Sequence, residues 1–300
     1  MIATARLART QAAAGRLLAT ALLVGSIVGA STLMQAAVMQ QAHANPLGLA
    51  QNGSGGLEVE SDNGIEWRRN EQILIARGNA VAKRGTSRVD ADELQALYRD
   101  RDGNSEIYRI IATGNVRLSS DTDVATGDKA VYDIDQAVVV LTGENLKYQT
   151  PKETLTAEES LEYWETDRIA VARGNAVAVA EDRTLRGDTL TARFEPGKGG
   201  TNELRRIDGD GNVTIRTPTD FVIGDQGVYD AKTGIATLIG SVKITRGENQ
   251  LNGDRAVVDL NTGISRLTTN GKGGSKNRVR GLLIPEKDEK DGPADAGTGN

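Results

Sequence analysis

The chain has 300 residues, with 36 Lys and Arg against 41 Asp and Glu, so its formal net charge is −5. It contains no Cys and a single His, His43. This composition excludes disulfide bonds, and it leaves residues 44–300 without an imidazole for a catalytic triad or a metal site. The acidic balance also argues against a nucleic-acid-binding surface.

Residues 1–44 have the pattern of a secretory signal peptide. Three arginines and no acidic residue occupy residues 1–16, and an apolar run follows from Leu17 to Met34. Ala42-His43-Ala44 has the small-x-small form of a signal-peptidase site, so we expect cleavage before Asn45. The alternative is an uncleaved membrane anchor, since the apolar stretch is about long enough to span a bilayer.

Two further segments differ in composition from the body of the chain. Residues 45–56 (NPLGLAQNGSGG) are typical of a flexible linker. Residues 271–300 are basic and then acidic, and we expect this C-terminal tail to be partly disordered. The folded body is therefore predicted to span residues 57–270.

A tandem duplication lies within this body. The heptapeptide ARGNAVA occurs at 76–82 and again at 172–178, and TDVATGDKAVYD (122–133) matches TDFVIGDQGVYD (219–230). The two copies cover about 57–143 and 154–240. Because no Gly/Ser-rich linker separates them, we expect the copies to stack into one continuous structure.

A shorter repeat of about 30 residues lies inside the long one. A Gly that opens an apolar-alternating run is followed 14 or 15 residues later by an acidic residue. The glycines are Gly78, Gly114, Gly143, Gly174, Gly211 and Gly240, and the acids are Asp92, Asp128, Glu158, Asp188, Asp225 and Asp254. An active site occurs once whereas turn chemistry repeats with the fold, so we interpret these acids as structural.

The repeats have the alternation of half-buried strands. In GNVRLSS, Val116 and Leu118 lie on one face and Arg117 on the other. Around Asp128, the apolar positions on the two sides differ in parity, which a regular strand cannot place on one face. We therefore expect a bend or bulge at this Gly-Asp step, where Gly127 has no Cβ. The chain is predicted to be all-β.

The repeated Gly-Asn-Val units, each followed by L-x-G/A-D-x-A-x-Y-D, resemble the OstA-like proteins of lipopolysaccharide export. RVRGLLIP (278–285) is similar to the endings of that family, and the resemblance covers roughly 57–285. It implies an elongated, twisted β-jellyroll with an apolar interior, working in the periplasm. It also implies lipopolysaccharide carriage from the inner to the outer membrane, with homologous jellyrolls of both membranes' export components as partners.

The resemblance and the strand pattern together give candidate contact residues. Side chains expected to line the interior and contact acyl chains are Val116, Leu118, Ala130, Tyr132, Val213, Ile215, Tyr229, Val242 and Ile244. The edge strands of a stack leave backbone groups free for a partner's strand, and this predicts head-to-tail self-association. The candidate edge contacts are Leu57, Val59, Ala256, Val258 and Leu267. The small side chains of both ARGNAVA copies predict a wide place in the interior, present twice.

Two other classes of function remain open. One is an exported β-repeat scaffold or adhesin without lipid cargo. The other is a polysaccharide-active β-helix enzyme, which would need a unique pair of carboxylates that the repeats do not offer. We expect no catalytic residue, no cofactor and no metal site, and no nucleic-acid partner.

Overall fold

The structure is a computed structural model that describes residues 57–197, 202–269 and 278–284. Within these ranges the chain consists of strands and turns and contains no helix, so none is long and apolar enough to cross a membrane. The strands form one 18-stranded sheet with antiparallel pairing throughout, which confirms the all-β expectation. The predicted signal peptide (1–44), the linker (45–56) and most of the C-terminal tail lie outside the described residues.

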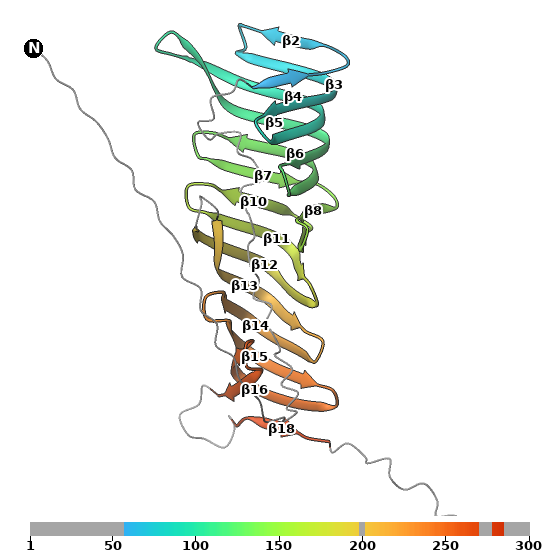
Figure 1. The fold of residues 1–300 in the computed structure, drawn as a ribbon, viewed down its shortest axis with the longest axis vertical. Coiled ribbons are helices and arrows are strands. Elements are labelled where there is room, and N and C mark those ends of the chain that lie inside the picture. The colour runs from blue at the N-terminus through green and yellow to red at the C-terminus, as the bar shows by residue number, and fades with distance from the viewer. Residues whose placement is uncertain (1–56, 198–201, 270–277, 285–300) are drawn as a thin grey trace, which may run out of the picture. The chain divides into compact units, whose positions relative to one another are not determined.

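The strands are stacked in nearly the same order in which they occur along the chain, as Figure 1 shows. The first nine are β1 (Glu58–Glu60), β2 (Ile65–Arg68), β3 (Ile73–Arg84), β4 (Ser87–Arg101), β5 (Asn104–Ser119), β6 (Val124–Asp133), β7 (Val138–Thr142), β8 (Leu146–Gln149) and β9 (Glu153–Ala157). The other nine are β10 (Ser160–Trp164), β11 (Ile169–Ala180), β12 (Arg183–Pro196), β13 (Asn202–Arg216), β14 (Asp220–Asp230), β15 (Ile235–Arg246), β16 (Asn249–Asp259), β17 (Ile264–Thr268) and β18 (Arg280–Leu282).

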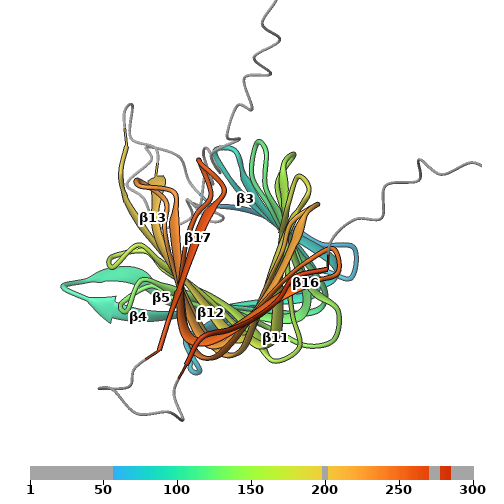
Figure 2. The same cartoon turned by 90° about the horizontal axis from the view of Figure 1, so that it is seen from below.

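The sheet is a simple antiparallel meander of bent strands. Where the chain forms two short strands in place of a long one, both pieces pair with the same neighbour: β7 and β8 with β6, and β10 and β9 with β11. Strands β1, β8, β9 and β18 belong to one half of the bent sheet, and β2, β7, β10 and β17 to the other. Seen along the stack in Figure 2, the strands curve around a common axis.

Strand pairing runs without a break through the junction between the two sequence copies. There, β7 pairs with β10 and β8 pairs with β9, so residues 144–153 carry the sheet onward instead of forming a linker. The two copies are therefore joined by backbone hydrogen bonds, as the missing linker composition predicts.

Alternate long strands carry a two-residue corner, at the Gly-Asn steps of β3, β5, β11 and β13 and at Gly240-Ser241 of β15. Gly114 and Asn115 have φ of 77° and 48°, two consecutive residues in the left-handed region that Gly and Asn tolerate best. The register of β5 against β6 shifts between Thr113 and Val116, and a single residue of β6, Asp128, lies opposite the two-residue corner. This is a β-bulge, and it confirms the bend expected at the Gly-Asp step.

The bulge explains how both halves of a strand face the same interior. Skipping one residue at Asp128 reverses the parity of β6, so Ala125, Ala130 and Tyr132 are all buried together. The corner of β5 skips two residues and keeps the parity, so Ala112 joins them from the same strand as the predicted Val116.

The repeated acids fasten these corners. The Asn115 side-chain amide donates to both carboxylate oxygens of Asp92, at 3.2 and 2.9 Å. A Cβ added to Gly114 would lie 2.1 Å from Asp92 Oδ2, so the carboxylate occupies the space that glycine leaves open. The acid therefore belongs to the corner of the following strand, and not to the Gly78 that precedes it by 14 residues.

The same contact recurs with variations. Asn212 donates to Asp188 at 3.1 and 2.9 Å, and Asn175 donates to Glu158 at 2.8 Å. In the broken strand β7–β8, the backbone N–H of Glu144 donates to Asp128 Oδ2 at 2.7 Å. The structural interpretation of the repeated acids is confirmed at these corners.

The glycine of the Gly-Asp step has a different role from the glycine of the corner. Gly127 does not have a positive φ, but a Cβ there would meet Leu146 Cδ2 at 2.8 Å and Leu141 Cγ at 2.9 Å. The bend at this step therefore comes from the corner opposite, whereas Gly127 makes room for leucines that fill the interior.

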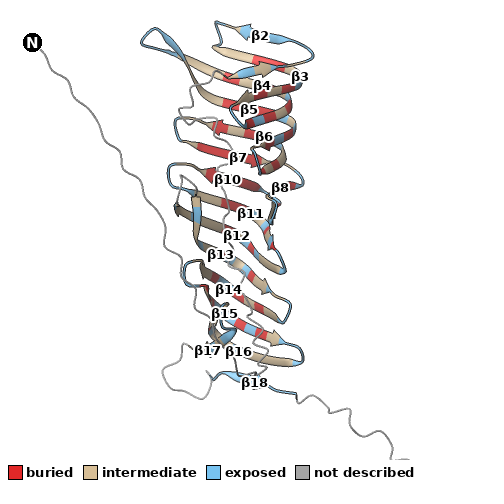
Figure 3. Cartoon of the chain, in the orientation of Figure 1, coloured by how far each residue is buried: buried red, intermediate tan, exposed pale blue. Residues whose placement is uncertain are grey.

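Two core clusters fill the interior. The first core cluster consists of buried side chains from Ala76 on β3 to Leu190 on β12. The second core cluster runs from Val213 on β13 to Ala256 on β16. Leu185 packs against both, so the clusters meet between β12 and β13 and not at the junction of the sequence copies. Figure 3 shows the buried segments recurring along successive strands.

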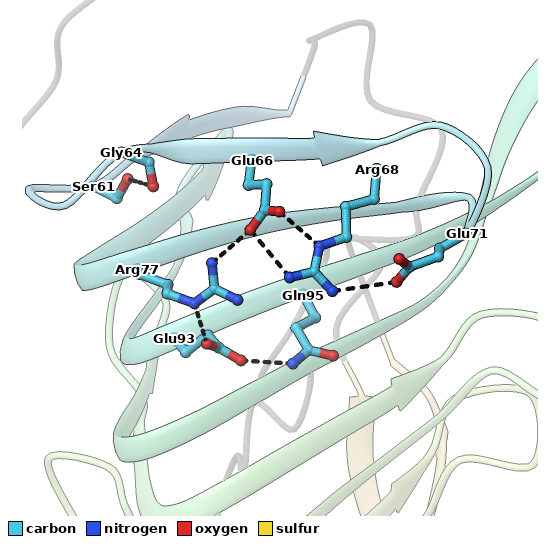
Figure 4. Close-up of polar contacts among 8 residues, drawn as sticks. All are labelled: Ser61, Gly64, Glu66, Arg68, Glu71, Arg77, Glu93 and Gln95. Carbon is cyan, nitrogen blue, oxygen red and sulfur yellow. Dashed lines mark hydrogen bonds and ion pairs between the residues drawn. The ribbon is translucent and has the colours of Figure 1, made fainter.

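Polar side chains tie β2 to its neighbours on the outer face (Figure 4). Glu66 accepts from Arg68 Nε at 2.7 Å and from Arg77 Nη1 at 2.9 Å, and Arg77 also donates to Glu93 of β4 at 2.8 Å. The two arginines lower the pKa of Glu66 to about 2. Because these groups are exposed, the network contributes more to register than to stability.

Alanine substitution of two glycines distinguishes two costs in stability. One is the cost of a positive φ at a residue with a side chain, and the other is the cost of a clash between the new Cβ and Asp92. Gly103 has a φ of 80° and open space where a Cβ would lie, whereas Gly114 has a φ of 77° and the Asp92 carboxylate in contact. We expect Gly103→Ala to lower the free energy of unfolding by ~1 kcal/mol. We expect Gly114→Ala to cost ~3 kcal/mol, since it also displaces the carboxylate. Equal shifts in urea unfolding midpoints would contradict the role assigned to Asp92.

Candidate functional site

The predicted interior residues belong to the two core clusters or pack against them. Val116, Leu118, Ala130 and Tyr132 are buried members of the first core cluster, and Val213, Val242 and Ile244 belong to the second. Ile215 and Tyr229 are half-buried and pack against the second core cluster. These nine side chains therefore share one apolar interior, and their contact with lipid stays a prediction.

A cavity of about 150 Å³ lies within this interior. Its lining comes from both halves of the bent sheet, over β5 to β13. Apolar side chains form most of the lining, including Leu118, Ala125, Val139, Leu155, Ala178 and Phe194. Of the nine predicted interior residues, only Leu118 lines this cavity.

The two ARGNAVA copies differ at the cavity. Ala172 and Ala178 of the second copy line it, whereas Ala176 and the equivalent Ala76, Ala80 and Ala82 of the first copy do not. Ala82 lies opposite Val59 of β1, and the equivalent Ala178 lies opposite Leu155 of β9, so both positions have an apolar neighbour across the strand pair. The cavity beside Ala178 agrees with the wide place expected in the second copy, and the wide place expected in the first copy stays a prediction.

One margin of the cavity carries buried polar groups. The Tyr148 hydroxyl donates to Asp123 Oδ2 at 3.0 Å, and Thr122 donates to Asp123 Oδ1 at 2.8 Å. Asp123 is only 3% exposed, and Tyr148 and Glu153 line the cavity. Burial raises the pKa of Glu153, and the nearby Asp123 carboxylate raises it further.

The other half of the sheet contributes a second polar group. Tyr163 of β10 lines the cavity and accepts a hydrogen bond from Asn202 Nδ2 at 3.1 Å, and burial raises its pKa to about 12. Nearby, Tyr132 donates to Glu165 Oε2 at 3.3 Å. Burial raises the pKa of Glu165, whose Oε1 has no hydrogen-bond partner among the described residues.

Apart from Tyr132, sequence reasoning missed these polar groups. One signal was present: Asp123 lies in the TDVATGD segment, and the second copy has Asp220 at the same place. Asp220 pairs with Arg246 at 2.7 Å instead of with a tyrosine, so the repeated motif alone does not indicate a site. Among the described residues, no group of three or more Asp, Glu, His or Cys side chains is arranged to hold a metal ion.

The predicted edge residues fall on two kinds of strand. Val59 on β1 and Leu267 on β17 lie on strands that pair on one side only within the described ranges, and Leu57 directly precedes β1. Ala256 and Val258 instead lie on β16, which pairs with β15 on one side and with β17 and β18 on the other. The C-terminal edge is thus one strand further along the chain than these two residues.

Comparison with known proteins agrees with this architecture. The sequence profile of a family described as "LptA/(LptD N-terminal domain) LPS transport protein" matches residues 58–163, 156–264 and 221–296. The chain belongs to this family. The first two matches fall on the two sequence copies, so the LptA/LptD N-terminal family unit is present here in tandem.

Two similar proteins show how much of the chain is matched by individual sequences or structures. "Uncharacterized protein R00383" of Rhizobium meliloti (strain 1021) is 29% identical over 124 residues, which are 40% of this chain and 66% of that protein, just under two thirds. The crystal structure of LptH, "the LptA homologous periplasmic component of the conserved lipopolysaccharide transport device from Pseudomonas aeruginosa", is 12% identical. The match covers 77% of this chain and 96% of LptH with a TM-score of 0.20, so the fold assignment rests on the strand pairing itself.

Replacement of Glu165 by Gln tests the burial of its carboxyl. An acid whose pKa is raised by folding disfavours the folded state above that pKa, and this penalty disappears as pH falls toward the ordinary value of 4.5. We therefore expect Glu165→Gln to be more stable than the wild type at pH 7 and to lose this advantage as pH approaches 4.5. A stability difference that is independent of pH, measured by urea unfolding, would contradict the assignment.

Proposed function

We propose that this protein carries lipopolysaccharide through the periplasm, from the inner to the outer membrane, with the acyl chains held inside the bent sheet. The observation that carries the proposal is an apolar interior that continues from β3 to β16 and contains a cavity. Membership in a family of lipopolysaccharide transport proteins supports the same cargo.

The interior suits acyl chains better than the charged part of the glycolipid. Each CH₂ group moved from water into an apolar interior contributes ~0.8 kcal/mol. The polar groups of the cavity margin include the carboxyls of Asp123 and Glu153, which repel anions. The phosphates and sugars would therefore remain outside while the chains are enclosed.

We propose that the chain docks through its end strands. At one end β1 and β2, and at the other β17 and β18, pair on one side only among residues 57–197, 202–269 and 278–284. Apolar side chains are exposed on these strands, with Trp67 57% and Ile264 65% exposed. Homologous jellyrolls of the inner- and outer-membrane export components, or a second copy head to tail, would extend the sheet there.

An enzyme acting on polysaccharide finds less support. Its carboxylates would have to be a unique pair free to act on a glycosidic bond. Asp92, Asp188 and Glu158 are instead each engaged by the asparagine of a corner. A β-repeat scaffold without cargo shares the fold, so binding of lipid distinguishes it from the carrier.

A photocrosslinking scan in Gram-negative cells tests the carrier proposal. Crosslinkers at Val116, Leu118, Val213 and Ile215 should form lipopolysaccharide adducts, because these side chains face the interior. Crosslinkers at Arg117 and Thr214, on the opposite face, should not. Absence of adducts from every position, with folded and exported protein, would refute carriage and favour the scaffold.

Two proline variants of β17 test strand addition. In an edge strand, alternate N–H groups point to the neighbouring strand and to solvent, so Ser265→Pro and Arg266→Pro remove one of each kind. The variant that loses the inward N–H should be destabilised by ~1 kcal/mol or more. The other should fold normally but lose head-to-tail association in sedimentation experiments. Wild-type association by both variants would contradict docking at β17.

A further inference from the structure

The cavity has a margin that is polar but not basic, and this combination restricts its occupant. We infer that the cavity is a subsite for a single alkyl chain whose uncharged hydrogen-bonding end lies against Tyr148, Glu153 and Tyr163. The inference rests on the proposed function and adds the chemical class of the group at the point where a chain leaves the interior.

The size and lining of the cavity suit one hydrocarbon chain. Its volume is about 150 Å³, and the wall is formed by alanine, valine and leucine side chains such as Val139, Leu155 and Ala178. Enclosed apolar cavities of about this volume take up apolar ligands the size of benzene. A segment of one alkyl chain therefore fits, whereas a sugar or a phosphate would lose its hydration without replacement.

The margin offers hydrogen bonds from both halves of the sheet. Tyr148 of β8 donates its hydroxyl proton to Asp123, so its oxygen remains available as an acceptor. Tyr163 of β10 accepts from Asn202, so its own proton remains available to a ligand. A hydroxyl, ester or amide on the chain can use this acceptor and this donor.

Charge at the margin opposes an anion. Asp123 is buried beside Tyr148, Glu153 lines the same cavity, and no Lys or Arg side chain is among the residues that line it. Burial and the Asp123 carboxylate raise the pKa of Glu153, and the same surroundings disfavour the charge of a bound anion. A carboxylate or phosphate would add a further negative charge, whereas an uncharged polar group would not.

Binding of two matched probes to the purified mature protein tests the charge preference. The probes are 1-dodecanol and dodecyl phosphate, which share a twelve-carbon chain and differ in the charge of the end group. We expect the wild type to favour dodecanol by about tenfold or more, and Glu153→Gln to strengthen dodecyl phosphate binding by about tenfold. Equal binding of both probes by the wild type would overturn the uncharged-end assignment.

Two variants at the wall test the location of the chain. Ala178→Phe fills the cavity and should weaken dodecanol binding at least about tenfold, whereas Val177→Phe, one residue away on the opposite face, should leave it unchanged. If Ala178→Phe fails to fold, Leu155→Ala enlarges the cavity instead and should shift the preference toward 1-tetradecanol. Dodecanol binding that none of these changes affects would place the chain elsewhere.

The experiments can refute the subsite without refuting the carrier proposal, and the reverse. Loss of the subsite would leave lipopolysaccharide adducts at Val116 and Ile215 in place, because these residues do not line the cavity. Conversely, dodecanol binding that depends on Ala178, without any lipopolysaccharide adduct in cells, would keep the subsite and refute the carrier.

Discussion

The contact between an acidic side chain and the Gly-Asn corner of a neighbouring strand is the interaction on which the rest of the structure depends. At Gly114 and Asn115, two left-handed residues turn the strand, and Asp92 of the preceding strand occupies the space beside the glycine. A flat antiparallel sheet of the same strands would expose one apolar face to water. Because the corners recur at matching register positions along the stack, the two halves of the sheet face each other and enclose that surface.

The bulge also decides which side chains are enclosed. At the bulge, one residue of the acid-bearing strand and two residues of the glycine-bearing strand are left out of the pairing. As a result, the inward-facing side chains on both sides of the bulge point to the same interior. The result is an interior that continues over the junction of the two copies and forms two adjoining core clusters.

The two copies differ in the side chains that they place in and beside the interior. The second ARGNAVA lines a cavity together with Leu155, which lies opposite Ala178. Asp123 bonds to Tyr148 at that cavity, while its counterpart Asp220 pairs with Arg246. The duplication therefore repeats the framework, and the differences fall on the side chains that a ligand would meet.

Much of this framework follows from local sequence. Strand positions, the bend at the Gly-Asp step and the inward face are encoded by alternation and by residues that tolerate positive φ, so Val116, Tyr132 and Val213 are assigned to the interior from the sequence alone. Other features depend on which strands and halves come to lie opposite each other. These include the pairing of Asp92 with the corner of the next strand, the cavity at the second heptapeptide, and the Asp123–Tyr148 contact. Only the tertiary structure decided them, because each joins residues from different strands, and no local pattern records that proximity.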